Sequence, residues 1–245
     1  MSAEARPEAP TLSARAGEVL SRIDAAARRA GRTPAEVSLV AVSKTHPAAL
    51  VREAAAAGLR DFGENRVQEA EAKMAELRPS APGLRWHLIG HLQPNKARRA
   101  ARLFDLIHSV DSAALVGRLE RICAEEARGA LDVLVQVDLA GEATKSGAAE
   151  GELPAVFEVL GGCARVRCRG LMLLPPFFED AERARPYFRR LRALRDEWGA
   201  RGAFAGGGRG ELSMGMSHDY EVAVEEGATL VRVGTAVFGE RGGQA

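Results

Sequence analysis

Apolar, β-branched stretches alternate with amphipathic helical stretches along almost the whole chain, and this alternation restricts the possible folds more than any other feature. Eight stretches are typical of buried strands, namely residues 38–43, 61–64, 86–90, 106–110, 131–139, 166–174, 212–215 and 229–238. Helical patterns lie between them at residues 48–57, 67–77, 113–127, 152–160, 181–198 and 220–226. A further amphipathic helix is expected at residues 11–30, ended by Gly31. Because eight strands alternating with helices fit one closed sheet, the chain is predicted to be an α/β protein, a single (β/α)8 TIM barrel with an extra N-terminal helix.

A doubly wound open sheet would show the same alternation, so strand number alone leaves it open as the alternative. Two features favour the barrel. No G-x-G-x-x-G motif follows the first strand, and polar residues gather just after several different strands, where barrels carry their chemistry. The barrel is expected to span residues 11–241, with a polar, Pro-containing flexible tail at 1–10 and a short tail at 242–245.

Composition argues against several classes of function. The net charge of +1 leaves no general electrostatic footprint for nucleic acid or for an anionic membrane. No apolar run is long enough to cross a bilayer, and the N-terminus has no apolar signal segment, so a cytoplasmic protein is expected. The three cysteines, Cys123, Cys163 and Cys168, do not have a metal-binding spacing.

Lysine is scarce in this chain. Among 34 Lys and Arg residues only four are lysines, namely Lys44, Lys73, Lys96 and Lys145. Because arginine serves wherever a positive charge suffices, a retained lysine is more often one whose amine reacts, for example with a carbonyl to form a Schiff base. Scarcity does not choose among the four, but Lys44 directly follows the first strand, V-S-L-V-A-V-S-K.

The turns after the last two predicted strands have the composition of a phosphate site. Residues 213–217 (S-M-G-M-S) precede a helix for which Ser217 is a plausible N-cap, and Gly234-Thr235 end the last strand and open a short turn. Small and hydroxyl residues expose backbone N–H groups, and a helix N-terminus adds partial positive charge. Since barrels commonly bind phosphate after strands seven and eight, a phosphate seat is predicted here; two capped turns without a ligand are the alternative.

His87 and His91 are separated by three residues, as in some zinc sites on helices. Gly90 and Pro94 break any helix here, and four residues of strand span roughly 13 Å, so no metal site is predicted. His87 lies either near a bound ring or phosphate at the barrel mouth or in the core with its hydrogen bonds satisfied.

Arg232 is the only charge in the apolar stretch 230–233. A buried unpaired cation is costly, so Arg232 is expected to face either an acidic residue or an acidic ligand. A reactive amine beside a phosphate seat suggests pyridoxal 5′-phosphate (PLP), whose aldehyde forms a Schiff base with lysine. A phosphate-bearing sugar in an aldolase-like barrel would need the same groups, and these residues do not separate the two ligands.

Longer motifs do separate them: A-V-S-K-T, F-G-E-N-R-V-Q-E, W-H-L-I-G-H-L-Q-P-N-K, T-K-S-G, R-G-L-M and L-S-M-G-M-S-H-D-Y-E…V-R-V-G-T-A-V-F-G. From about residue 12 to residue 241 they closely resemble the PLP homeostasis proteins, the YggS/PROSC-type family related to the N-terminal barrel of alanine racemases. The resemblance implies a barrel of that type with PLP as a Schiff base on Lys44. It also implies that Asn65 and His87 lie beside the cofactor and that Ser213, Gly234 and Thr235 hold its phosphate.

By the same resemblance, Arg232 lies near the pyridine nitrogen. As a charged donor it would keep that nitrogen unprotonated and weaken PLP as an electron sink. Racemases also take a second acid/base from a partner subunit involving a C-terminal β domain, whereas this chain ends soon after the eighth strand. The chain is therefore expected to act in intracellular PLP homeostasis, by buffering or delivery without substantial catalysis, and a weak PLP-dependent amino-acid racemase is the alternative.

PLP-dependent apo-enzymes are expected as transient partners of a chain that is itself a monomer. Lys145, in the T-K-S-G loop, is a candidate second amine for PLP exchange.

Overall fold

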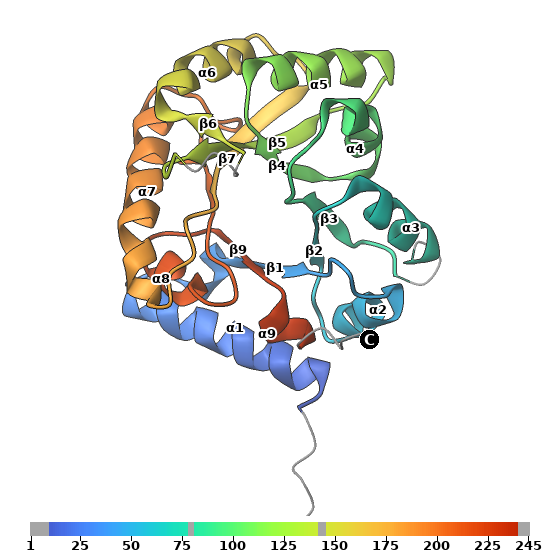
Figure 1. Ribbon diagram of the computed structural model, residues 1–245, viewed down its shortest axis with the longest axis vertical. Coiled ribbons are helices and arrows are strands. Elements are labelled where there is room, and N and C mark those ends of the chain that lie inside the picture. Colours follow the sequence, from blue (N-terminus) through green and yellow to red (C-terminus); the bar gives the residue numbers. More distant parts are fainter. Residues whose placement is uncertain (1–9, 78–80, 142–145, 240–245) are drawn as a thin grey trace, which may run out of the picture.

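The computed structural model of the protein describes residues 10–77, 81–141 and 146–239. The strands in this part of the chain are all parallel and have these bounds: β1 (Ser38–Val42), β2 (Asp61–Glu64), β3 (Arg85–Leu88), β4 (Leu106–Val110), β5 (Leu131–Asp138), β6 (Ala148–Ala149), β7 (Val166–Leu173), β8 (Glu211–Ser213) and β9 (Leu230–Val233). Their order is β1-β2-β3-β4-β5-β7-β8-β9, and β9 pairs with β1, so the sheet closes into a barrel (Figure 1). The short strand β6 only extends the carboxyl end of β5. The predicted (β/α)8 barrel is confirmed, and the open-sheet alternative is wrong.

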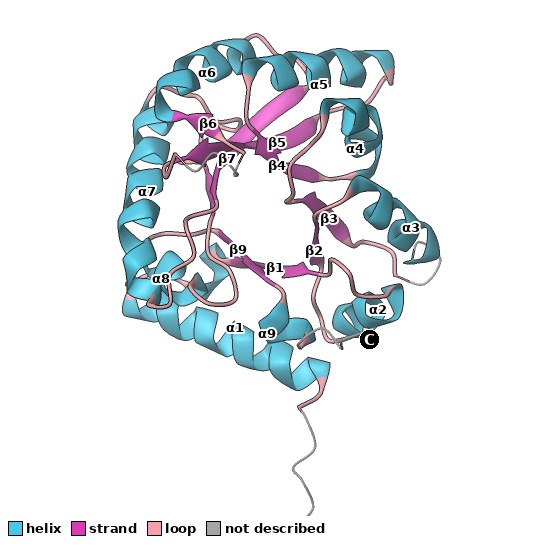
Figure 2. Ribbon diagram, in the orientation of Figure 1, coloured by secondary structure: helices cyan, strands magenta, loops and turns pink. Residues whose placement is uncertain are grey.

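Helices surround the barrel as an outer ring (Figure 2). Their bounds are α1 (Leu12–Arg29), α2 (Ala48–Ala56), α3 (Val67–Leu77), α4 (Ala97–Leu103), α5 (Ala113–Glu125), α6 (Leu153–Gly161), α7 (Arg185–Ala200), α8 (Tyr220–Glu225) and α9 (Thr235–Phe238), with 3-10 turns η1 (Pro34–Glu36), η2 (Pro94–Lys96), η3 (Glu150–Glu152) and η4 (Ala181–Ala184). None of the helices among the described residues is long and apolar enough to cross a membrane.

Most elements lie within a few residues of the sequence-based expectation, and two differences are larger. The last strand ends at Val233 rather than continuing to residue 238, because the backbone turns at Gly234 and α9 begins at Thr235. Helix α4 was not expected because its buried face consists only of alanines, which leave a weak apolar period.

The extra N-terminal helix, α1, packs along the β9 side of the barrel against α8 and α9 (Figure 1). The Thr11 side chain caps its start by accepting a hydrogen bond from the Ala14 N–H, and Gly31 follows its end with a φ of 68°. Its buried face carries Val19 and Ile23. The predicted N-terminal helix is thus confirmed.

The apolar core has two parts. One lies between the barrel and the helices, and the other is a small cluster of Val40, Leu106, Leu134, Met172 and Leu230, which come from five different strands. Since side chains alternate between the two faces of a strand, these five fill the inside of the barrel. They separate the amino-terminal end of the barrel from the mouth, where the carboxyl ends of the strands meet.

Candidate functional site at the barrel mouth

Lys44 follows β1 at the mouth. Because side chains alternate along a strand, Lys44 lies on the same side as Val40, which faces the barrel interior. The Lys44 side chain is partly exposed. Its amine forms no hydrogen bond or ion pair with any of the residues that the structure describes, and the next residue, Thr45, has a φ of 66°. The turn therefore presents a free amine at the mouth.

A buried lysine holds the backbone beneath that turn. Lys73 Nζ donates to the Ser43 carbonyl at 2.5 Å, to Glu64 Oε1 at 2.6 Å and to Glu69 Oε1 at 2.9 Å. The Ser43 hydroxyl donates to the same Glu64 oxygen at 2.7 Å. Burial raises the pKa of Glu64, and its second oxygen is buried without a hydrogen-bond partner among the described residues. Lys73 thus joins the residue before Lys44 to β2.

The Gly234-Thr235 turn lies beside the Lys44 turn. Strands β9 and β1 are paired, and a Cβ on Gly234 would lie 3.3 Å from the Val42 carbonyl oxygen. The His46 ring stacks on Phe238 at 5.0 Å between centroids, which ties the loop after β1 to α9. The first N–H groups of α9 have no intrahelical acceptor and are available at this point.

Ser217 connects the turns after β8 and β9. Its hydroxyl oxygen accepts a hydrogen bond from the Gly234 N–H at 3.2 Å. It is not the cap of α8, as had been expected: that helix begins at Tyr220, its N-cap is Asp219, and the Asp219 carboxylate accepts from the Met216 N–H at 2.6 Å. The sequence motif contains two serines, and its composition alone could not tell which one faces this turn.

Ser213, the other serine, is fully buried inside the barrel. Its oxygen accepts from Arg232 Nη1 at 2.6 Å and lies 2.8 Å from His108 Nδ1. The hydroxyl is therefore already engaged, and its predicted contact with phosphate stays a prediction.

Arg232 is 3% exposed, and its partners are neutral. Besides Ser213, it donates to the Leu173 carbonyl at 2.8 Å, and within residues 10–77, 81–141 and 146–239 it forms no ion pair. Burial lowers the pKa of Arg232 to about 10, and the Asp219 carboxylate opposes this shift. The described residues therefore give no support to the acidic-residue alternative, and the contact of Arg232 with an acidic ligand stays a prediction.

His87 and His91 lie in different surroundings. His87 is fully buried, with Nδ1 2.9 Å from His108 Nε2 and Nε2 2.9 Å from Asp61 Oδ1. His91 is half exposed and lies 3.5 Å from Asp111. The structure favours the core hydrogen-bond alternative for His87, and its contact with a cofactor stays a prediction. No group of three or more His, Cys, Asp or Glu side chains in the described part of the chain is placed to hold a metal ion.

Asn65 follows β2, and its backbone packs tightly against Gly90, where a Cβ would lie 2.3 Å from the Asn65 carbonyl oxygen. Both line a pocket of about 460 Å³ at the ends of β2 and β3, which Arg66 and Lys96 also line. Asn65 therefore lies at the mouth, as does Lys96. Lys145 lies outside the described residues.

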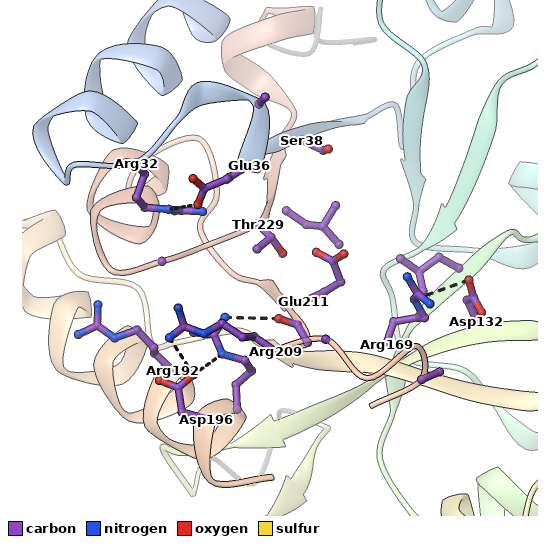
Figure 3. A pocket seen from close by; sticks show the side chains of 18 of the residues that line it. Arg32, Glu36, Ser38, Asp132, Arg169, Arg192, Asp196, Arg209, Glu211 and Thr229 are labelled. Carbon is purple, nitrogen blue, oxygen red and sulfur yellow. Dashed lines mark hydrogen bonds and ion pairs between the residues drawn. The ribbon is translucent and has the colours of Figure 1, made fainter. Parts of the chain in front are cut away.

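A larger cavity, of about 830 Å³, lies at the amino-terminal end of the barrel (Figure 3). It is rich in arginine, but the charges are paired there: Arg32 lies 3.2 Å from Glu36, and Arg209 lies 3.4 Å from Asp196. The interior apolar cluster separates it from Lys44. Barrels carry their chemistry at the opposite end, so the mouth is the better candidate.

Comparison with known proteins identifies the family of this chain. Residues 18–242 match the family described as "Alanine racemase, N-terminal domain". The chain is 48% identical to the pyridoxal phosphate homeostasis protein of Pseudomonas aeruginosa, over 94% of this chain and 96% of that protein. The chain belongs to the pyridoxal phosphate homeostasis protein family. A further member, from Aquifex aeolicus, is 44% identical over 93% of this chain and 97% of its own length.

Solved structures agree as well. The PipY protein of Synechococcus elongatus, determined with PLP bound, is 44% identical and superposes with a TM-score of 0.81, covering 94% of this chain and 100% of that chain. The alanine racemase of Corynebacterium glutamicum shares the barrel fold at 20% identity and a TM-score of 0.62, over 90% of this chain and 60% of that enzyme. The predicted family resemblance is confirmed.

Proposed function

We propose that this protein binds PLP at the barrel mouth, attached to Lys44 as a Schiff base, and serves PLP homeostasis by buffering or delivering the cofactor. Members of its family carry the homeostasis name, and a relative 44% identical has been solved with PLP.

The observation that carries the proposal is Arg232, a buried guanidinium without a carboxylate partner among the described residues. It lies on β9, directly beside β1, which ends in the free amine of Lys44. An amine for an aldehyde and a donor for a ring nitrogen thus occur on neighbouring strands. The Gly234 N–H is taken by Ser217, but the Thr235 and Ala236 N–H groups have no acceptor among the described residues and are suited to a phosphate.

PLP itself would supply an aldehyde and an electron-withdrawing ring. Lys44 would hold the aldehyde carbon, and Asn65 and the two turns would orient the ring and the phosphate. Arg232 can only donate hydrogen bonds, so an acceptor nitrogen facing it stays unprotonated. A neutral ring withdraws electrons weakly, which supports storage of the cofactor rather than catalysis.

The test is reconstitution with PLP followed by visible absorbance of the Schiff base. We expect one equivalent to bind to the wild type. Lys44→Ala and Lys44→Arg should both lose the visible band, and Lys44→Arg, which keeps the charge, should retain weak non-covalent PLP binding. A wild type that binds no PLP, or a Lys44→Arg variant that keeps the band, contradicts the proposal.

The second candidate is a weak amino-acid racemase, which the shared fold with alanine racemase favours. Incubation of the PLP-loaded protein with L-amino acids in deuterated water distinguishes the two. Solvent deuterium at the α-carbon and D-isomer formed much faster than with free PLP, both dependent on Lys44, would establish the racemase.

Delivery to apo-enzymes and a monomeric state complete the proposal. Among the described residues Phe177 is the large apolar side chain with the greatest exposure, 76%, and it packs near His218 after β8. A single exposed aromatic ring fits a transient contact but not the apolar area of a stable dimer. Transfer of PLP to an apo-enzyme faster than its spontaneous release, and a monomeric mass in solution, would support both points.

A further inference from the structure

A chain of hydrogen bonds crosses the inside of the barrel and ends at Arg232. It runs from Asp61 on β2 through His87 on β3 and His108 on β4 to Ser213 on β8, with successive atoms 2.9, 2.9 and 2.8 Å apart. Arg232 Nη1 closes the chain at 2.6 Å from Ser213 Oγ. His87, His108 and Ser213 have no exposed surface, and each ring nitrogen of both histidines has a partner.

The two ends determine the direction of every proton in this chain. Arginine can only donate and a carboxylate can only accept. Ser213 accepts from Arg232, so its own O–H can donate to His108 Nδ1. His108 then carries its proton on Nε2 and donates to His87 Nδ1, and His87 donates from Nε2 to Asp61.

The opposite direction requires an extra charge. Suppose that His108 donated from Nδ1 to Ser213. His87 would then have to donate from Nδ1 to His108 Nε2. Its unprotonated Nε2 would face the Asp61 carboxylate, unless His87 took up a second proton and became charged. Burial, with the positive charge of Arg232 nearby, holds the pKa of His108 well below its usual value, which favours a neutral His108. With His108 neutral, only the direction from Arg232 to Asp61 satisfies the Asp61 carboxylate without an extra charge on His87.

We propose that Asp61, His87 and His108 are positioning residues for Arg232: they orient the Ser213 hydroxyl so that its lone pair faces the guanidinium and holds it toward the mouth. This inference rests on the proposed binding of PLP there. In the described part of the chain, two of the five N–H groups of Arg232 have acceptors, Ser213 Oγ and the Leu173 carbonyl. The others are left for a ligand, and the predicted ligand atom is the ring nitrogen.

The arrangement is more than a way of filling the barrel. A neighbouring layer of the interior is filled with five apolar side chains, which need no hydrogen-bond partners. Four polar groups in a row must all be satisfied, since one unpaired member is costly when buried. A chain of this kind specifies one orientation of its terminal residue, and here the terminal residue is the buried cation.

The test compares two ligands: PLP, and a PLP analogue in which a C–H group replaces the ring nitrogen. Both keep the aldehyde and the phosphate, so only PLP can accept from Arg232. We expect the wild type to bind PLP at least about tenfold more tightly than the analogue, as for one hydrogen bond from a charged donor. In His108→Leu this preference should fall to about one, with the affinity for the analogue unchanged.

His108→Asn is the matched control. Its amide oxygen can take the place of Nδ1 and accept from Ser213, so most of the preference should return. Asp61 lies at the far, partly exposed end of the hydrogen-bond chain. Two substitutions there form a second pair of variants, which tests the inference if His108→Leu does not fold. Asp61→Asn keeps an acceptor for His87 and should keep the preference, whereas Asp61→Leu should reduce it.

Equal weakening of both ligands in His108→Leu would show a merely structural role and overturn the inference. Retention of the full PLP preference in both His108→Leu and Asp61→Leu would also overturn it. A wild type that binds neither ligand contradicts the proposed function instead, so the two failures are distinguishable.

Discussion

Removal of Lys73 should expose the cost of burying Glu64 beneath the Lys44 turn. Lys73→Ala deletes three hydrogen bonds, at 2.5, 2.6 and 2.9 Å, and leaves Glu64, whose side chain is 0% exposed, with the Ser43 hydroxyl as its remaining hydrogen-bond partner. Breaking a buried ion pair by removing one partner costs about 3–5 kcal/mol. We expect the free energy of unfolding to fall by about that amount at neutral pH.

The deficit should depend on pH in a direction set by Glu64. Burial already raises its pKa, and the bond from Lys73 is the first effect opposing that rise. Without Lys73 the pKa of Glu64 rises further, so the folded state binds a proton that the unfolded state releases. Stability then increases as the pH falls toward the ordinary carboxyl value, by up to about 1.4 kcal/mol per pH unit for one proton. The variant should be weakest at high pH.

Urea denaturation followed by tryptophan fluorescence measures this effect. Three variants separate charge from packing: Lys73→Ala, Lys73→Met, which refills the volume without charge, and Lys73→Ala combined with Glu64→Gln. We expect Lys73→Met to recover little of the lost free energy of unfolding. The added Glu64→Gln should recover at least half of it, because that substitution removes the unpaired charge. A loss below about 1 kcal/mol, equal deficits at pH 5 and pH 8, or no recovery with Gln would refute the reasoning.

Three further outcomes are expected. Gly90→Ala should lower Tm and weaken PLP binding, because its Cβ would lie 2.3 Å from the Asn65 carbonyl oxygen; Gly117→Ala, with nothing within 4 Å, is the matched control and should not destabilise. The pKa of His108 lies well below its usual value, so below pH 6.5 the unfolded chain binds a proton at this residue that the folded chain does not bind. The free energy of unfolding of the wild type should therefore fall by up to about 1.4 kcal/mol per pH unit below pH 6.5. A His108→Asn variant whose stability has the same pH slope would contradict this. Burial raises the pKa of Cys168 to about 12, so a thiol reagent at pH 8 should modify it no faster than the protein unfolds, as measured by mass spectrometry; rapid labelling of the folded protein would count against it.

Local patterns were sufficient for most of the fold. Apolar β-branched stretches marked the strands, and the bounds of β2, β4 and α3 agree with the pattern. The failures also have local causes. The alanine-faced helix α4 has too small an apolar contrast to be recognised, and Gly234 redirects a backbone whose residues on both sides look strand-like.

From the sequence, the candidate site could be predicted only where the chemistry of a single residue was enough to suggest its role. Lys44 was identified by its scarcity and its place at a strand end, and the structure leaves its amine free of partners among the described residues. The two serines of the S-M-G-M-S motif were not distinguishable, since both are small hydroxyl residues of one short motif at the end of a strand. Only the register of β8 against its neighbours turns Ser213 inward, and only the approach of Gly234 selects Ser217.

By itself, the sequence determined the alternation of strands and helices, hence the barrel, and the position of one lysine amine at its mouth. These follow from the period of apolar residues and from chemistry that a single side chain carries. Only the tertiary structure decided that Arg232 has no carboxylate partner among the described residues and that His108 links it to Asp61. Closure of the barrel brings His108 within 2.8 Å of Ser213, 105 positions away. A hydrogen bond depends on that approach in space, which no local pattern records.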